Sequence, residues 1–163
     1  MRRAFLIYIC LAMPFNVVLL NPEIPNNTGN IGRLCLGTGS MLHLIKPLGF
    51  SLEDKQLKRS GLDYWPRLSV KIYDNWEAFL AQNKGASLAF YSSHATQIYW
   101  DLKAEDNQFF IFGSESKGLP ATLLKEMTVH SYKIPLAPDS IRSFNLANAV
   151  SIVLFDGLRQ QSF

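Results

Sequence analysis

Short runs of β-branched and aromatic residues alternate along this chain with segments in which apolar residues recur at helical spacing. This alternation is typical of parallel strands that are joined by crossover helices. Several of the runs are apolar at nearly every position, as expected for strands that are covered on both faces. We interpret the runs at 15–20, 42–45, 70–73, 87–91, 109–112 and 130–134 as strands. The sequence therefore predicts an α/β fold with a central, mostly parallel sheet and helices on both of its faces.

Two helices are expected near the first strands. Thr28 is a candidate N-cap, because apolar residues follow it at helical spacing as far as the glycines of 37–39. Further along, Asp74 and Glu77 form a start similar to a capping box for a helix that continues through Leu80. These signals place one helix after the first strand and another after the third.

The last expected helix, over about 143–160, is apolar on more than one face. One face carries Leu146, Val150, Val153, Leu154 and Leu158, whereas Ile152 and Phe155 lie on another. A single apolar face suffices for a helix that packs only on its own domain. The extra face indicates either deep burial within the domain or contact with a second subunit, for which a symmetric dimer is the simplest arrangement.

The chain has 163 residues, of which 48% are hydrophobic, so it is long enough for one compact domain and too short for two typical ones. Its start imitates a signal peptide, because Arg2 and Arg3 precede ten apolar residues at 4–13. Ten residues are too few to span a bilayer, and no A-x-A cleavage site follows. We therefore expect an N-terminal extension or a misplaced start over 1–12 and a single domain over 13–163.

The charged and metal-binding residue types exclude some functions. The formal net charge of +3 permits contact with nucleic acid but is too small to indicate it alone. The cysteines form no C-x-x-C pair and the histidines lack the i, i+4 spacing of a helical metal site. We therefore expect no bound metal, no membrane anchor and a reducing, cytoplasmic location.

Three segments that each follow an expected strand are richer in Gly, Pro and Asn than ordinary connections: 21–33, 112–120 and 134–149. Ligands of open α/β sheets bind at these carboxyl ends. The first segment offers free backbone N–H groups at a helix start, with Arg33 one turn inside. The second lacks the order of a phosphate loop, because Leu119 and Pro120 follow Gly118. In the third, Ser143 and Asn145 stand where helix caps are wanted.

In this order and spacing, the three segments resemble the motifs of SpoU-type SPOUT methyltransferases, most closely the small tRNA wobble-ribose enzymes of the TrmL (YibK) group. The resemblance extends from about residue 15 to 160 and includes the stretch 54–64. It implies a SPOUT fold with a deep trefoil knot in the C-terminal third, an exception to the usual unknotted rule. It further implies a homodimer that uses S-adenosyl-L-methionine to methylate the 2′-oxygen at position 34 of the tRNA anticodon stem-loop. An enzyme for rRNA or another tRNA position, and a non-catalytic RNA-binding homologue, are the alternatives.

The resemblance also assigns site residues. The chemistry centres on Arg33, with Asn26, Glu115, Ser143 and Asn145 around it. The cofactor is held mainly by backbone groups at Tyr91, Gly113, Gly118, Ile134, Leu136, Ser143 and Leu146. Because a guanidinium stays protonated in proteins, we interpret Arg33 as a phosphate anchor that also stabilises negative charge on oxygen. We expect Arg33 to share one pocket with Gly113 and Asn145.

The expected RNA surface consists of Arg33, Lys55, Lys58 and Arg59, with Arg67 and Lys71 nearby. Three aromatic residues, Tyr64, Trp65 and Trp76, either stack on anticodon bases or belong to the core. The chain departs from the family pattern at Ala147, where a serine is common, and at Phe155 and Asp156, which replace a Tyr-Glu pair. These departures place the RNA-contacting or subunit-packing roles of those side chains in question but leave Arg33, Ser143 and Asn145 in place.

Overall fold

The computed structural model describes residues 15–52 and 64–162. The expected extension over 1–12 and the expected RNA-binding residues Lys55, Lys58 and Arg59 therefore lie outside the described residues. The strands are β1 (Asn16–Leu20), β2 (Met41–Ile45), β3 (Val70–Tyr73), β4 (Leu88–Tyr91), β5 (Gln97–Ile98), β6 (Phe109–Phe112) and β7 (Ser131–Lys133). The α-helices are α1 (Pro25–Thr38), α3 (Trp76–Gln82), α4 (Ala121–Glu126) and α5 (Leu146–Ser162), and short 3-10 turns lie at Trp65–Arg67, Tyr99–Asp101 and Thr128–His130.

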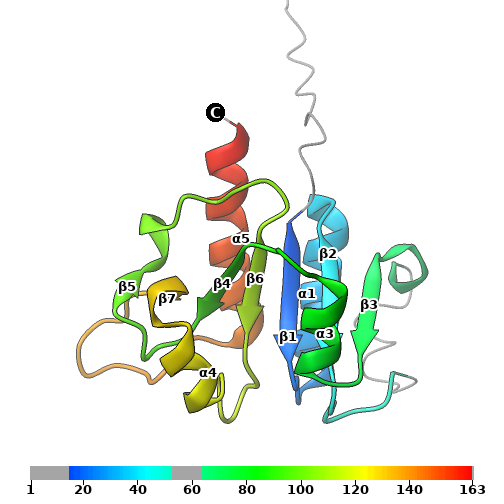
Figure 1. Cartoon of the computed structure of the whole chain (residues 1–163), viewed down its shortest axis with the longest axis horizontal. Coiled ribbons are helices and arrows are strands. Elements are labelled where there is room, and N and C mark those ends of the chain that lie inside the picture. The colour runs from blue at the N-terminus through cyan, green and yellow to red at the C-terminus, as the bar shows by residue number, and fades with distance from the viewer. Residues whose placement is uncertain (1–14, 53–63, 163) are drawn as a thin grey trace, which may run out of the picture.

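The strands form one sheet in the order β3-β2-β1-β6-β4-β7-β5, and every pairing within it is parallel (Figure 1). The six strands expected from the sequence are confirmed, with bounds that differ by at most one residue. Strand β5 was not expected, because its two residues contain no apolar run. The parallel pairing turns all carboxyl ends toward one edge of the sheet, where ligands of open α/β sheets bind.

Both faces of the sheet are covered, and alternate residues of each strand enter different cores. Val17 and Leu19 of β1 pack in a cluster with residues of α1 and α5, such as Ile31 and Val153. Their neighbours Val18 and Leu20 instead pack in a second cluster with residues of α3 and α4, including Phe79. This period-two alternation explains why all five residues of β1 are buried.

Helix starts differ from the expectation, in each case for a local reason. Helix α1 begins at Pro25, whose fixed φ suits the first helical position, so Thr28 lies inside the helix and is fully buried rather than at its cap. Helix α3 begins one residue later than expected, because Asn75 rather than Asp74 caps it by accepting the N–H of Ala78 at 2.8 Å. Helix α5 begins at Leu146, not near Ser143, because Asn145 caps it by accepting the N–H of Ala147 at 2.9 Å.

A polar network lies inside the second core. His43 is 1% exposed, and its Nε2 and Nδ1 lie 2.9 Å from the Asn16 Oδ1 and the Tyr73 hydroxyl, respectively. Burial, with a smaller contribution from the charge of Lys71, lowers the pKa of His43 to about 4. The imidazole is therefore neutral near pH 7 and satisfies two buried partners instead of a ligand.

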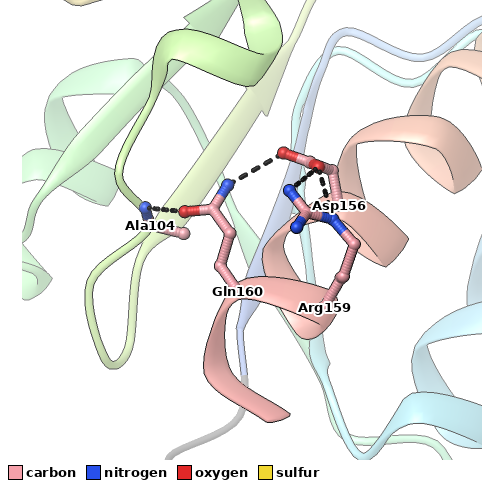
Figure 2. A network of polar contacts seen from close by, with 4 residues as sticks. All are labelled: Ala104, Asp156, Arg159 and Gln160. Carbon is pink, nitrogen blue, oxygen red and sulfur yellow. Dashed lines mark hydrogen bonds and ion pairs between the residues drawn. The ribbon is translucent and has the colours of Figure 1, made fainter. Parts of the chain in front are cut away.

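The last turns of α5 hold the connection between β5 and β6 (Figure 2). The Asp156 carboxylate accepts from Arg159 Nη2 at 2.9 Å and from Gln160 Nε2 at 2.8 Å. Gln160 Oε1 in turn accepts the backbone N–H of Ala104 at 2.9 Å. Asp156, whose side chain is shorter than the glutamate of the family pattern, thus orients Gln160, which in turn fixes the loop between β5 and β6.

Candidate active site

A cavity of about 500 Å³ opens at the carboxyl ends of β4, β6 and β7, the edge to which the arrowheads of β4 and β6 point in Figure 1. Its walls come from each loop that follows these strands and from the start of α5. The lining comprises 91–94, 112–119 and 142–146 together with Ile24, Asn27, Ile134, Leu136 and Ala149. A volume of this size suits a small organic ligand.

All of the residues expected to hold the cofactor line this cavity: Tyr91, Gly113, Gly118, Ile134, Leu136, Ser143 and Leu146. They come from three loops that are far apart in the sequence and meet because their strands are parallel neighbours. Of the residues expected around the chemistry, Glu115, Ser143 and Asn145 also line the cavity, whereas Asn26 and Arg33 do not.

The turn 113–118 closes on itself through two glycines. Ser114 and Gly118 form an isolated antiparallel bridge, and Gly118 adopts a left-handed φ of +68°. A Cβ at Gly113 would lie 2.0 Å from the carbonyl carbon of Gly118, which is far inside van der Waals contact. The narrow turn therefore requires glycine at both positions and exposes backbone groups to the cavity.

Tyr91 forms part of the apolar floor. Its ring stacks on Phe112 with 4.9 Å between centroids and an interplanar angle of 14°. Burial raises the pKa of Tyr91 well above its ordinary value, with further contributions from Tyr132 and Asp156. The phenol is therefore neutral at physiological pH, so Tyr91 contributes a packing surface and no base.

The Glu115 carboxylate organises the cavity wall. It accepts the backbone N–H groups of Glu23 at 2.8 Å and Ile24 at 3.2 Å, and the side-chain amide of Asn27 at 3.0 Å. These donors lie at the approach to α1, where the helix dipole favours a negative charge. Glu115 therefore accepts N–H groups at the helix start where the sequence predicts free backbone donors.

Asn27, not Asn26, completes the contact between the loops. Its Oδ1 accepts from Asn145 Nδ2 at 3.0 Å, and Asn145 Oδ1 accepts the N–H of Ala147 at 2.9 Å and so caps α5. Asn26 is exposed. Helical spacing contained the signal that separates the two asparagines, because Asn27 lies four residues before Ile31 on the buried face of α1.

Arg33 lies on the outer face of α1. It is exposed, and its guanidinium carbon lies 5.8 Å from the centroid of the Tyr64 ring. The Tyr64 hydroxyl donates to the carbonyl of Gly29 in the same helix. The expectation that Arg33 enters the pocket of Gly113 and Asn145 is therefore wrong within one subunit.

The other expected RNA contacts divide between surface and core. Arg67 and Lys71 are exposed. Tyr64 is 6% exposed and belongs to the core. Trp76 is partly buried and packs against the second core cluster, where it stacks on Phe79 with 5.1 Å between centroids. Trp65 is partly buried, and one of its ring atoms lies 3.1 Å from where a Cβ on Gly32 would stand.

Among residues 15–52 and 64–162, no group of three His, Cys, Asp or Glu side chains is placed to hold a metal ion. In the same part of the chain, no helix is both long and apolar enough to cross a membrane.

Comparison with known proteins identifies the family. A model of the SpoU rRNA Methylase family matches residues 14–155. The chain belongs to this family. A tRNA (cytidine(34)-2'-O)-methyltransferase from Saccharophagus degradans is 44% identical over 150 residues, which cover 91% of this chain and 97% of that relative.

Two solved structures share the fold. One, from a study of the 2-OH methylation of C/U34 on tRNA, has a TM-score of 0.88 and 38% identity, and the match covers 93% of this chain and 98% of the other. The SpoU methyltransferase AviRb from Streptomyces viridochromogenes, in complex with its cofactor AdoMet, has a TM-score of 0.80 and 20% identity. That match covers 91% of this chain and 58% of AviRb.

Proposed function

We propose that this protein transfers a methyl group from S-adenosyl-L-methionine to the ribose 2′-oxygen of wobble position 34 in the tRNA anticodon loop. The observation that carries the proposal is one cavity in a chain of the SpoU family. It is lined by residues of all three segments that are rich in Gly, Pro and Asn, 21–33, 112–120 and 134–149, which we call the first, second and third motif loops. The name of the Saccharophagus relative and the subject of the 38% identical structure support position 34.

The cavity fits the proposed cofactor. Ile134, Leu136 and Leu146 provide aliphatic walls for an adenine ring, and the turn 113–118 brings backbone donors and acceptors to the rim. The pocket is no phosphate loop, which agrees with a cofactor that has no phosphates. When bound, S-adenosyl-L-methionine supplies a methyl group on a cationic sulfur that an oxygen nucleophile attacks in line.

The residues of the chain itself then orient the RNA. Ser143 lies at the cavity wall and is exposed, so its hydroxyl is free to hydrogen-bond a ribose oxygen. Asn145 is held by Asn27 and Ala147, which fixes the wall beside it. Orientation of this kind supplies much of the acceleration of a transfer reaction. The hydroxyl proton leaves to an RNA phosphate or to water.

Arg33 enters this proposal as an anchor for an RNA phosphate outside the cavity. Its exposure and its place beside the Tyr64 ring suit a guanidinium that binds phosphate through two N–H groups. Lys55, Lys58 and Arg59 remain proposed members of the same RNA surface, which would act through phosphates and weaken with salt.

We also infer a homodimer. Phe155 of α5 is 58% exposed although it belongs to a helix whose other face is buried, and a symmetric partner would cover it. A location in the cytoplasm follows from the proposed tRNA substrate.

We further infer that the C-terminal third is knotted, as in SPOUT enzymes. Support comes from the strand order, because β7 lies between β4 and β5, which both precede it in the sequence. An experimental structure in which α5 can be drawn out without passing through a loop would refute the knot.

A methylation assay tests the function. The purified protein is incubated with unmodified tRNA or rRNA and labelled S-adenosyl-L-methionine, and 2′-O-methyl nucleotides are mapped by nuclease digestion and mass spectrometry. We expect label at nucleotide 34 of tRNA with the wild type and little with Asn145→Ala. Label in rRNA or at another tRNA position would reject the assignment, and cofactor binding without turnover would favour a non-catalytic RNA-binding protein.

A further inference from the structure

Two carboxylates connect the first and second motif loops in opposite directions. Glu23 accepts from Ser116 twice, from the backbone N–H at 2.9 Å and from the hydroxyl at 2.6 Å. Glu115, the residue before Ser116, accepts the backbone N–H of Glu23 at 2.8 Å. We refer to Glu23 and Glu115 as the reciprocal carboxylate pair. Each loop thus donates N–H groups to the carboxylate of the other.

The reciprocal carboxylate pair closes a ring of hydrogen bonds. Neither loop can move away from the other without breaking bonds at both carboxylates. The ring also reaches the third motif loop, because Glu115 accepts from Asn27 at 3.0 Å and Asn27 accepts from Asn145 at 3.0 Å. All three loops around the cavity are therefore connected by direct hydrogen bonds.

Glu23 differs from Glu115 in its position. Glu115 and Ser116 line the cavity, whereas Glu23 does not. The Ser116 hydroxyl and then the Ser116 N–H lower the pKa of Glu23 against a small opposing effect of burial, and Lys117 lowers it further. Glu23 is therefore ionised at neutral pH, and hydrogen bonds to an ionised acceptor are stronger than neutral ones.

We propose that Glu23 is a positioning residue of the cofactor site, which holds the turn 113–118 in its cofactor-binding shape by way of Ser116. The inference rests on the proposed function. Glycines at both ends of this turn give it many alternative conformations when it is unrestrained. A restraint that exists before the ligand arrives removes the cost of ordering the turn during binding.

Calorimetric titration of the full-length protein with S-adenosylhomocysteine tests the inference. Glu23→Ala is expected to weaken binding about tenfold, since it removes two charge-assisted hydrogen bonds near the surface. Glu23→Gln keeps one acceptor oxygen and is expected to recover part of this loss. Ser116→Ala keeps its N–H donor, so its effect is expected to be smaller than that of Glu23→Ala.

A double-mutant cycle separates positioning from a general effect. If Glu23 acts through Ser116, Ser116→Ala adds nothing to Glu23→Ala, and the two losses are not additive. Glu126→Ala is the matched control, because Glu126 is exposed on α4 and carries the same charge. The control is expected to bind S-adenosylhomocysteine like the wild type.

Two further measurements exclude a loss of folding. The thermal midpoint of ligand-free Glu23→Ala is expected to stay near that of the wild type, whereas the upward shift on adding S-adenosylhomocysteine is expected to shrink. In the methylation assay, KM for the cofactor is expected to rise while kcat at saturation changes little.

Wild-type affinity in Glu23→Ala, additive losses in the cycle, or an equal loss in Glu126→Ala would each overturn the positioning role. A wild-type protein that does not bind S-adenosylhomocysteine would instead overturn the proposed function, and the positioning role with it. The two failures are therefore distinguishable.

Discussion

Replacement of Gly113 by alanine is expected to abolish most of the activity without unfolding the protein. The added Cβ would lie 2.0 Å from the carbonyl carbon and 2.3 Å from the carbonyl oxygen of Gly118, and 2.2 Å from the N of Leu119. Ordinary contact begins at 3.4 Å, so relief requires the backbone of the turn to move by about 1.4 Å. A misplacement of about 1 Å at an active site costs about a hundredfold in rate.

The measurement is kcat/KM in the methylation assay together with the affinity for S-adenosylhomocysteine. Gly37→Ala is the matched control, because nothing lies within 4 Å of its added Cβ and its position is helical. Alanine there is expected to raise the free energy of unfolding by about 0.5–1 kcal/mol and to leave kcat/KM unchanged. Near wild-type kcat/KM in Gly113→Ala would refute the claim that this turn shapes the site.

Three further outcomes follow from the described contacts. Arg33→Lys is expected to lower kcat/KM for tRNA about tenfold while S-adenosylhomocysteine affinity stays constant, since lysine lacks the bidentate fork; full activity would exclude that recognition. His43 has a folded pKa of about 4, below its ordinary 6.5, so its contribution to the free energy of unfolding is fully present above pH 6.5 and is lost as the pH drops toward 4. The free energy of unfolding therefore changes by at most about 1.4 kcal/mol per pH unit. Urea unfolding from pH 4 to 7 measures this dependence, and we expect the contribution of His43 to disappear in His43→Gln. Phe155→Glu is expected to yield monomers in sedimentation equilibrium; an unchanged mass would place any dimer interface elsewhere.

The strands were predictable because their residues are buried on both sides of the sheet. In β1 every position is apolar except Asn16, and in β6 all four residues are apolar and buried. Burial of this kind dominates strand stability, so the apolar runs mark the strands directly. Strand β5 has no such signal, because both of its residues are only partly buried.

The helix starts were less predictable, because each depends on a choice between neighbouring residues. Asp74 and Asn75 are both good caps, and in the structure Asn75 takes this position with an extended backbone. At α1 the sequence predicts Thr28 as the N-cap, but the helix begins at Pro25. The backbone N–H groups of Glu23 and Ile24, just before it, donate to the Glu115 carboxylate. That carboxylate lies 90 residues further along the chain than Pro25, so no local pattern could indicate it.

The same distinction applies to the candidate site. Residues in the three loops reach one cavity because parallel strand ends share an edge, which the sequence pattern predicts. The position of Arg33 depends instead on which face of α1 is buried. That face carries Asn27, Ile31 and Cys35, and Arg33 falls outside it. Arg33 lies two residues, or about 200° around the helix, from both Ile31 and Cys35, so helical spacing places it on the outer face.

This arrangement divides the cofactor side of the site from the RNA side. The cavity is lined by the turn 113–118, by aliphatic side chains and by the charged residues Glu115, Lys117 and Arg142, whereas Arg33 lies on the outer face of α1, from which only Asn27 and the N-cap residue Ile24 line the cavity. RNA that presents a ribose at Ser143 must therefore extend across α1, or Arg33 must serve the cavity of a second subunit. Mixing Arg33→Lys and Ser143→Ala subunits distinguishes these arrangements, because activity returns in the mixed dimer only if each site takes its arginine from the partner.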